Sequence, residues 1–191
     1  MKNFVSLFVV VLTISSCCKD EVVGTHRLSD NQKSIISYDG SEELTFIDQN
    51  GDLHNALTTR DDATIDTYRR GTESCDLVET EELLSSLIFQ TSDISLIELR
   101  LFADIFTSFN LFAKASTSES RKGFNLVCED IEEVLIEENF QDVVIGQFEF
   151  QNVLVFQSCL ENSQIQQIIF SKENGVEFIE FSDPDKWLKL N

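Results

Sequence analysis

Proline, glycine and positive charge are scarce in this 191-residue chain. It has one Pro and seven Gly, which excludes collagen-like and low-complexity structure, and 42% of its residues are hydrophobic, as in a folded globular protein. Only 14 basic side chains accompany 34 acidic ones, which gives a formal net charge of -20. Because this charge repels phosphate backbones, the composition argues against nucleic-acid binding.

Catalytic and ligand-binding motifs are also missing. The sequence contains no G-x-S-x-G, H-E-x-x-H, G-x-G-x-x-G or Walker motif. The two histidines, His26 and His54, have no Cys or His neighbour at the spacing that a zinc site uses, so we expect no metal and no other cofactor. Clusters of acids such as Glu79, Glu81 and Glu82 are interpreted as solvated faces. We therefore expect a protein that is not an enzyme.

The chain has one hydrophobic run, and it is short. Residues 4–14 follow Met1-Lys2-Asn3 and are apolar except for Ser6 and Thr13. A helix that spans a membrane needs about 20 apolar residues, whereas a positively charged start and a short apolar stretch are typical of a secretory signal. We expect residues 1–16 to be a signal peptide that forms a helix and is then cleaved off.

The end of this run carries a specific pattern, Ile14-Ser15-Ser16-Cys17. An aliphatic residue three positions before a cysteine, followed by two small residues, resembles a bacterial lipobox. The resemblance implies that the Cys17 sulfur takes a diacylglyceryl group as a thioether. Cys18 fits the pattern less well, because Ser15 is not aliphatic.

Lys19, Asp20 and Glu21 follow the two cysteines. A lysine and two acidic residues just after the lipidated cysteine resemble the surface-export signal of Bacteroidota lipoproteins. The resemblance implies a protein that is lipid-anchored in the outer membrane and exposed at the cell surface. The membrane is then one partner, reached through the lipid anchor.

The rest of the chain divides into a tether and one domain. Residues 17–33 are polar and lack periodicity, which is typical of a flexible lipidated tether. Residues 34–191 have the length of a single domain. Within them Asp39-Gly40, Asn50-Gly51 and Asn174-Gly175 separate short alternating runs, as tight hairpin turns do.

Alternation with period two predicts strands in the first half of this domain. In residues 94–106 the apolar residues Ile97, Leu99, Leu101, Ala103 and Ile105 share one face, which favours a strand, although a helix would also align some of them. Residues 106–115 alternate again, and the polar run 116–123 makes a loop before Phe124, which predicts another hairpin.

The second half is richer in β-branched and aromatic residues. Residues 143–156, 165–171 and 176–181 are typical of strands, whereas 128–140 fits a helix and a strand equally well. The fold class we expect is mainly β, an antiparallel curved sheet or a two-layer β domain with at most one or two short helices.

The last quarter of the chain carries a further resemblance. It contains the segments Gly146–Val153, Ile168–Ser171 and Gly175–Ile179 and ends on Trp187-Leu188-Lys189-Leu190. This pattern resembles the closing strands of small uncharacterised Bacteroidota lipoproteins, which end in a W-x-L segment. The resemblance implies a fold and a location but no activity.

Cysteines leave one question of covalent structure open. Of Cys75, Cys128 and Cys159, at most one pair can form a bridge among the three, and the spacing does not select the pair. Buried thiols are an equally good interpretation.

These features support two functional hypotheses. The first is a lipid-anchored envelope lipoprotein with a non-enzymatic binding or accessory role towards an unknown protein or glycan. The alternative is an acidic inhibitor or immunity-type lipoprotein that blocks a basic hydrolase or toxin, because the charge of -20 would attract a cationic partner.

Lipidation of Cys17 can be tested directly. Metabolic labelling with a palmitate analogue should mark the wild-type protein, and Cys17→Ser should remove both the label and the membrane association, because stable anchoring needs several acyl chains. A Cys17→Ser protein that is still labelled would exclude this site.

Overall fold

The computed structural model describes residues 19–71, 74–91, 93–103, 107–116, 120–126, 139–160, 163–183 and 185–191. The expected signal peptide, the expected lipidation site Cys17 and all of the ambiguous segment 128–140 except Asn139 and Phe140 lie outside these residues. Strands make up 66% of the structure and helices 3%, which confirms the mainly β fold class.

The elements follow one another in chain order. They are β1 (Glu21–His26), α2 (Asp30–Lys33), β2 (Glu43–Asp48), β3 (Leu53–Arg69), β4 (Asp76–Phe89), β5 (Ile94–Ala103), β6 (Thr107–Ala115), β7 (Lys122–Phe124), β8 (Gln141–Ile145), β9 (Phe148–Gln157), β10 (Ile165–Ser171), β11 (Gly175–Phe181) and β12 (Trp187–Leu190).

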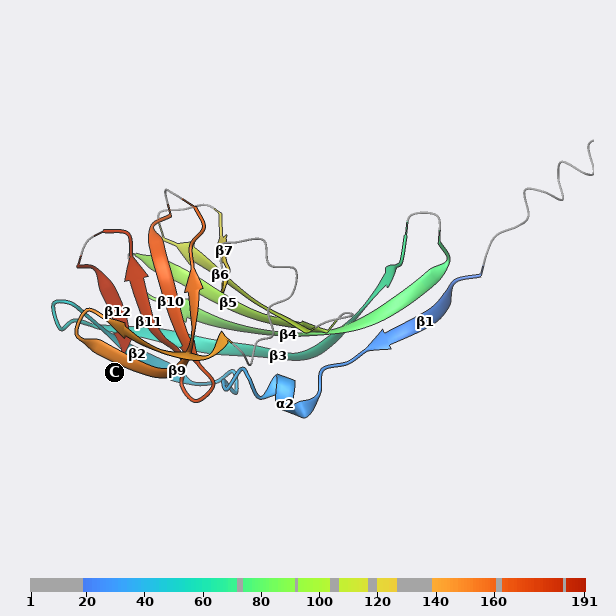
Figure 1. Cartoon of the computed structure of the whole chain (residues 1–191), viewed down its shortest axis with the longest axis horizontal. Coiled ribbons are helices and arrows are strands. Elements are labelled where there is room, and N and C mark those ends of the chain that lie inside the picture. The colour runs from blue at the N-terminus through green and yellow to red at the C-terminus, as the bar shows by residue number, and fades with distance from the viewer. Residues whose placement is uncertain are drawn as a thin grey trace, which may run out of the picture.

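All the strands belong to one curled sheet. Its order is β7-β6-β5-β4-β3-β2-β12-β11-β10-β9-β8, and each neighbouring pair on this path is antiparallel. Asn125, just after β7, exchanges two backbone hydrogen bonds with Gln157 of β9, with N–O distances of 3.2 and 2.8 Å. The sheet therefore curls until the β7 end reaches β9, the strand next to the other end, and Figure 1 shows the resulting rounded body.

Most of the predicted strands are confirmed. The Asn50-Gly51 turn joins β2 to β3, and Asn174-Gly175 joins β10 to β11. Gly51 and Gly175 have φ angles of +87° and +74°, the left-handed conformation that such turns require. Residues 94–103 and 107–115 are the expected strands β5 and β6, and β6 pairs with β7 as the expected hairpin. Strands β5 and β6 also pair with each other, and Trp187–Leu190 is the closing strand β12.

One turn prediction and one strand prediction need correction. Asp39-Gly40 has the expected positive φ, +88°, but it lies between α2 and β2 rather than between two strands, because Ile35, Ile36 and Tyr38 are buried in the core. The run 143–156 is two strands, since Gly146 turns the chain between β8 and β9.

The curled sheet is filled on its inner side. The main core cluster draws apolar side chains from β2 to β7, β9 to β12 and the segment 28–38. Tyr38 is part of this cluster, and its hydroxyl oxygen accepts a hydrogen bond from the N–H of Val176 at 2.6 Å. A Cβ at Gly175 would lie 2.0 Å from that hydroxyl oxygen, so the turn and the core require glycine there.

A second, smaller core lies on the outer side of the sheet. Strand β9 pairs with β8 through Phe148–Phe150 and, after a register shift, through Val153, and it pairs with β10 through Val153–Gln157. Asn152 has a φ of +52°. This bend lets the β8–β9 hairpin cover the outer face of β10 and β11, where Phe150, Val153, Val155, Ile169 and Phe178 are buried together. Of the two architectures expected from the sequence, the structure has the curved antiparallel sheet.

Strands β3 and β4 continue beyond the body. Strand β5 pairs with β4 only as far as Glu82, while β3 stays paired with β4 to Arg69↔Leu77, past a bulge between Asp61 and Thr64. Beyond Glu82, β1 takes the place of β5 on β4. We call the resulting three-stranded projection, residues 21–26, 64–71 and 74–81, the arm, and Figure 1 shows it extending away from the body.

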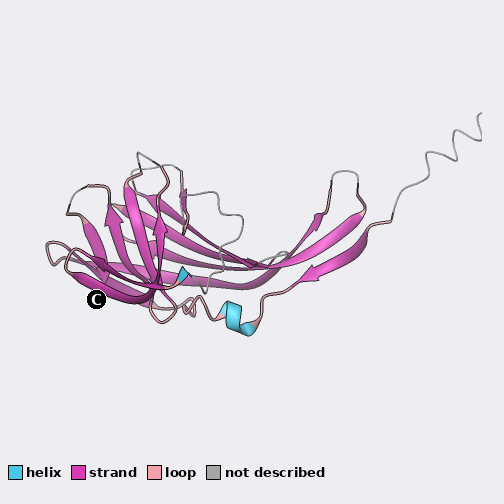
Figure 2. Ribbon diagram, in the orientation of Figure 1, coloured by secondary structure: helices cyan, strands magenta, loops and turns pink. Residues whose placement is uncertain are grey.

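The segment expected to be a flexible tether is partly folded. Residues 21–26 form β1, which pairs in parallel with Asp76–Thr80 of β4, and residues 30–33 form α2, the helix drawn in cyan below the sheet in Figure 2. Ser29 and Gln32 make a capping box at the start of this helix. The strand and the helix are held in place by contacts with β4 and with the core. Such distant contacts leave no periodic pattern in the local sequence, so the sequence did not predict these two elements.

Candidate functional site

Ion pairs attach the N-terminal segment to the sheet. The Arg27 guanidinium lies 2.7 Å from the Glu79 carboxylate, and the Lys33 ammonium lies 2.6 Å from that of Glu81. The second Glu81 oxygen accepts a hydrogen bond from the N–H of Leu28 at 2.8 Å. The acidic cluster of β4 is therefore used to hold residues 27–33.

Glu81 is the most buried of these acids, at 5% exposure. Burial would raise the pKa of its carboxyl, but the hydrogen bonds from Lys33 and Leu28 and the positive charges of Lys33 and Arg27 outweigh burial, and the pKa lies below its ordinary value. Glu82 also has a partner, because Arg100 lies 2.6 Å from its carboxylate. The cluster Glu79, Glu81 and Glu82, interpreted from sequence as a solvated face, is thus a set of ion pairs.

Lys19, Asp20 and Glu21 lie at the free end of the arm. Glu21 is the first residue of β1, pairs with Asp76, and donates its N–H to the carbonyl of Cys75 at 3.1 Å. Asp20 lies 3.0 Å from the guanidinium of Arg69, and both side chains are about half exposed, 48% and 51%. The expected export tripeptide is therefore joined to the folded arm.

The arm is exposed on both sides. Val22 and Val23 of β1 are 46% and 49% exposed, and Ile65 and Tyr68 of β3 are 52% and 39% exposed. Between them, Val78 and Thr80 of the central strand β4 are buried. The arm is therefore a thin structure with apolar groups on its surface.

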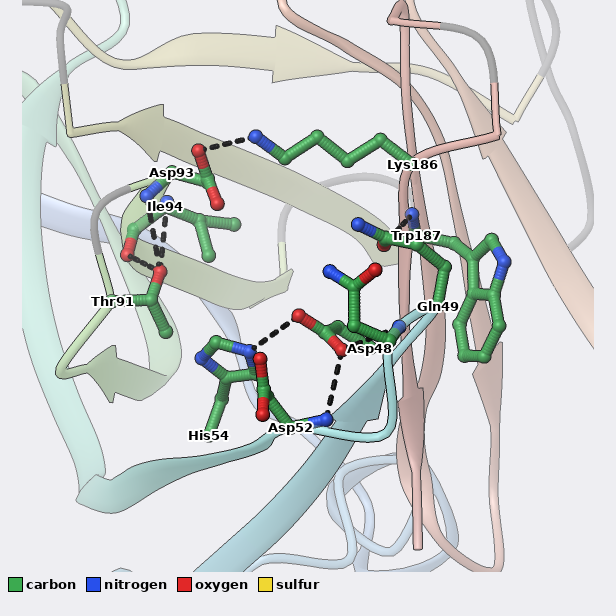
Figure 3. A network of polar contacts seen from close by, with 10 residues as sticks. Asp48, Gln49, Asp52, His54, Thr91, Asp93, Ile94, Lys186 and Trp187 are labelled. Atoms are coloured by element: carbon green, nitrogen blue, oxygen red, sulfur yellow. Dashed lines mark hydrogen bonds and ion pairs between the residues drawn. The ribbon is translucent and has the colours of Figure 1, made fainter.

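The end of the body farthest from the arm carries a polar network. We call the connections β2–β3, β4–β5 and β11–β12 the distal turns, because β3 starts there and ends in the arm. The Asp48 carboxylate accepts N–H bonds from Asn50 and Asp52, at 2.8 and 2.9 Å, and lies 3.2 Å from the Nε2 of His54 (Figure 3). Burial would raise the pKa of Asp48, but the bonds from Asp52, His54 and Asn50 lower it overall.

Two further contacts tie the distal turns to one another. The Lys186 ammonium lies 2.6 Å from the Asp93 carboxylate, and the N–H of Trp187 donates to the side-chain oxygen of Gln49 at 3.3 Å (Figure 3). The Trp187 ring packs against Phe148 and Phe178, with centroids 4.9 and 6.0 Å away. These polar groups and this ring serve the packing of the turns.

Metal, redox and membrane features were sought in the same part of the chain. Among the described residues no group of three or more His, Cys, Asp or Glu side chains is placed to hold a metal ion. Cys75 and Cys159 are each disulfide-bonded, whereas Cys128 lies outside the described residues. The helices described here include none with the length and hydropathy needed to cross a membrane.

Comparison with known proteins returned no relatives. No family model matches the chain, and neither the curated proteins nor the solved structures contain a match.

The attachment of residues 27–33 through Glu81 can be measured. Glu81→Gln should lower the free energy of unfolding of residues 19–191 by about 2 kcal/mol, because it weakens hydrogen bonds to a buried charge. The matched variant Glu79→Gln removes a more exposed ion pair and should cost less than about 1 kcal/mol. Urea unfolding at pH 7 gives both values, and equal losses would contradict the central role of Glu81.

The stability difference between the wild type and Glu81→Gln should also depend on pH. Since the folded pKa of Glu81 is lowered, its contribution to stability is complete above the unfolded-state pKa, about 4.3. It is lost as the pH falls from that value through the folded pKa. The stability difference between wild type and Glu81→Gln should therefore shrink below about pH 4.3.

Proposed function

We propose that the chain is a lipoprotein anchored through Cys17 in the outer membrane and exposed at the cell surface, with a non-enzymatic binding role in the envelope. The observation that carries this proposal is the continuous order of three features. The pattern Ile14–Cys17 is followed at once by Lys19, Asp20 and Glu21, and Glu21 opens strand β1 of the arm. An anchor at Cys17 would thus join the folded protein with almost no spacer.

Exposed apolar side chains on the body support a binding role. Leu57 and Ile88 are direct cross-strand neighbours in the β3–β4 pair and are 44% and 45% exposed. Leu53, four residues before Leu57 on the same strand, is 62% exposed. Side chains two and four apart on a strand point to the same face, so Leu53 shares this face with Leu57 but is separated from it by the polar Asn55. The exposed apolar contact is therefore the Leu57–Ile88 pair. The partner we propose is a protein or glycan of the envelope.

The export role of Lys19, Asp20 and Glu21 provides the test. Replacing all three with Ala should preserve lipidation but keep the protein inside, so that protease added to whole cells no longer digests it. The structure offers a matched control, because Arg69→Ala breaks the Asp20–Arg69 ion pair and leaves the tripeptide intact. Arg69→Ala protein should still be digested. If both variants stay inside, the folded structure around the Asp20–Arg69 ion pair rather than the tripeptide controls export, and the proposed signal is wrong.

Charge favours a second candidate function, an acidic inhibitor or immunity-type lipoprotein. Besides the net charge of -20, the exposed stretch of β3 carries Asp61, Asp62 and Asp66 on the surface. A cationic hydrolase or toxin would be attracted to such a surface over long range.

Salt distinguishes the two functions. Attraction of a basic partner acts over a Debye length that shrinks from about 10 Å at 0.1 M salt to about 3 Å at 1 M, so the association rate should fall steeply. The measurement uses residues 19–191 on a sensor with the partner identified by surface crosslinking. An association rate that does not change with salt would eliminate the inhibitor and leave contacts such as the Leu57–Ile88 pair.

A further inference from the structure

The start of the described chain lies at the free end of the arm. Strand β1 begins at Glu21, which pairs with Asp76, and Arg70 closes the β3–β4 ladder by donating its N–H to the carbonyl of Asp76 at 3.0 Å. In Figure 1 strand β1 starts at this end of the molecule, while the body lies at the other. We call residues 19–23, 68–71 and 74–77 the arm end.

Covalent geometry ties the arm end to any lipid on Cys17. Four residue steps separate Cys17 from Glu21. An extended chain advances at most about 3.6 Å per residue, so Glu21 lies no more than about 14 Å from the anchored residue. An anchor at Cys17 therefore brings the arm end, and not the body, to the bilayer.

Hydrogen bonds and ion pairs hold the three strands of the arm together, so an anchor at one end would fix the position of the whole arm. Its central strand β4 is hydrogen-bonded to β3 on one side and to β1 on the other. The ion pairs Asp20–Arg69 and Arg27–Glu79 fasten the two ends of β1 to its neighbours. Strand β3 has 17 residues and reaches from the distal turns to the arm end, a path of about 50 Å at about 3.3 Å per residue.

The composition of the arm end suits a lipid surface. The arm end contains three basic and three acidic side chains, so it is neutral in a chain of net charge -20. Val22, Val23 and Tyr68 are exposed there, beside the basic residues Arg69 and Arg70. Tyrosine is favoured at membrane interfaces, and arginine side chains bind anionic headgroups.

We propose that the arm is a stalk whose end rests on the bilayer and which holds the body and the distal turns away from it. The proposal rests on the lipidation of Cys17 and adds an orientation to it. The surface presented to partners is then the body, with the Leu57–Ile88 pair and the distal turns, while Tyr68, Val22 and Val23 contact lipid.

Tryptophan fluorescence tests the orientation, because the chain has a single Trp, Trp187, beside the distal turns. The full lipidated chain is purified from cells and added to preformed phosphatidylethanolamine–phosphatidylglycerol vesicles that contain brominated lipids. Two variants add a second Trp at exposed positions of the same strand, Tyr68→Trp at the arm end and Leu53→Trp at the distal end. Circular dichroism compares both folds with the wild type.

The bromine atoms should quench the emission added by Tyr68→Trp and leave unchanged both the Trp187 emission of the wild type and the emission added by Leu53→Trp. Quenching at both ends would mean that the body lies on the membrane, and quenching at neither end would mean that the arm end does not reach it. Either result overturns the stalk.

Palmitate labelling and vesicle flotation of the same samples keep the two proposals apart. If the Tyr68→Trp protein is labelled and floats but its added emission is not quenched, only the stalk is refuted. Unlabelled protein that does not float refutes the anchor as well.

Discussion

The antiparallel pairing of β3 with β4 is the interaction on which the rest of the structure depends. The ladder runs from Ala56↔Phe89 to Arg69↔Leu77, interrupted by one bulge. At its body end Leu83, Leu87 and Phe89 enter the main core, and the apolar area that they bury stabilises the sheet around them. At its other end the same two strands have no comparable core among the described residues, so the arm relies on backbone hydrogen bonds, on β1 and on ion pairs.

Strand β1 stabilises the arm by adding a third strand to it. A two-stranded hairpin in water is only marginally stable, and a third strand turns it into a small sheet. By lying on β4 beyond the end of β5, β1 covers Val78 and Thr80, both of which are buried. After β1, Glu81 binds the chain through the Lys33 ammonium and the N–H of Leu28. Helix α2 comes next, and after it Ile35 and Ile36 are buried in the main core. The N-terminal segment thus links the arm to the body.

Because β1 begins so close to Cys17, the proposed anchor would also limit the orientation of the domain. A flexible tether would let the domain take any orientation above a membrane, whereas an anchor four residues from a paired strand restricts it. The acidity of the chain also fits a body that stands away from anionic headgroups, because like charges repel and keep crowded surface proteins soluble. At the distal turns, Asp48, His54 and Trp187 make contacts within the protein that hold the turns in place.

The sequence by itself determined the fold class, the strands β5 and β6, the hairpin that ends at Phe124, and the glycine turns at Gly51 and Gly175. These features depend on alternation and on φ angles, which are local properties of neighbouring residues. The closing strand at Trp187 was expected from a resemblance and is present as β12. The arm, the strand formed by the expected tether and the bend at Asn152 were decided by the tertiary structure. Polar exposed stretches such as Thr64–Arg69 carry no alternation, and the order of Glu21–His26 comes from a partner strand more than 50 residues away. The ion-pair partners of Glu79, Glu81 and Glu82 are likewise fixed only when the folded chain brings distant residues together.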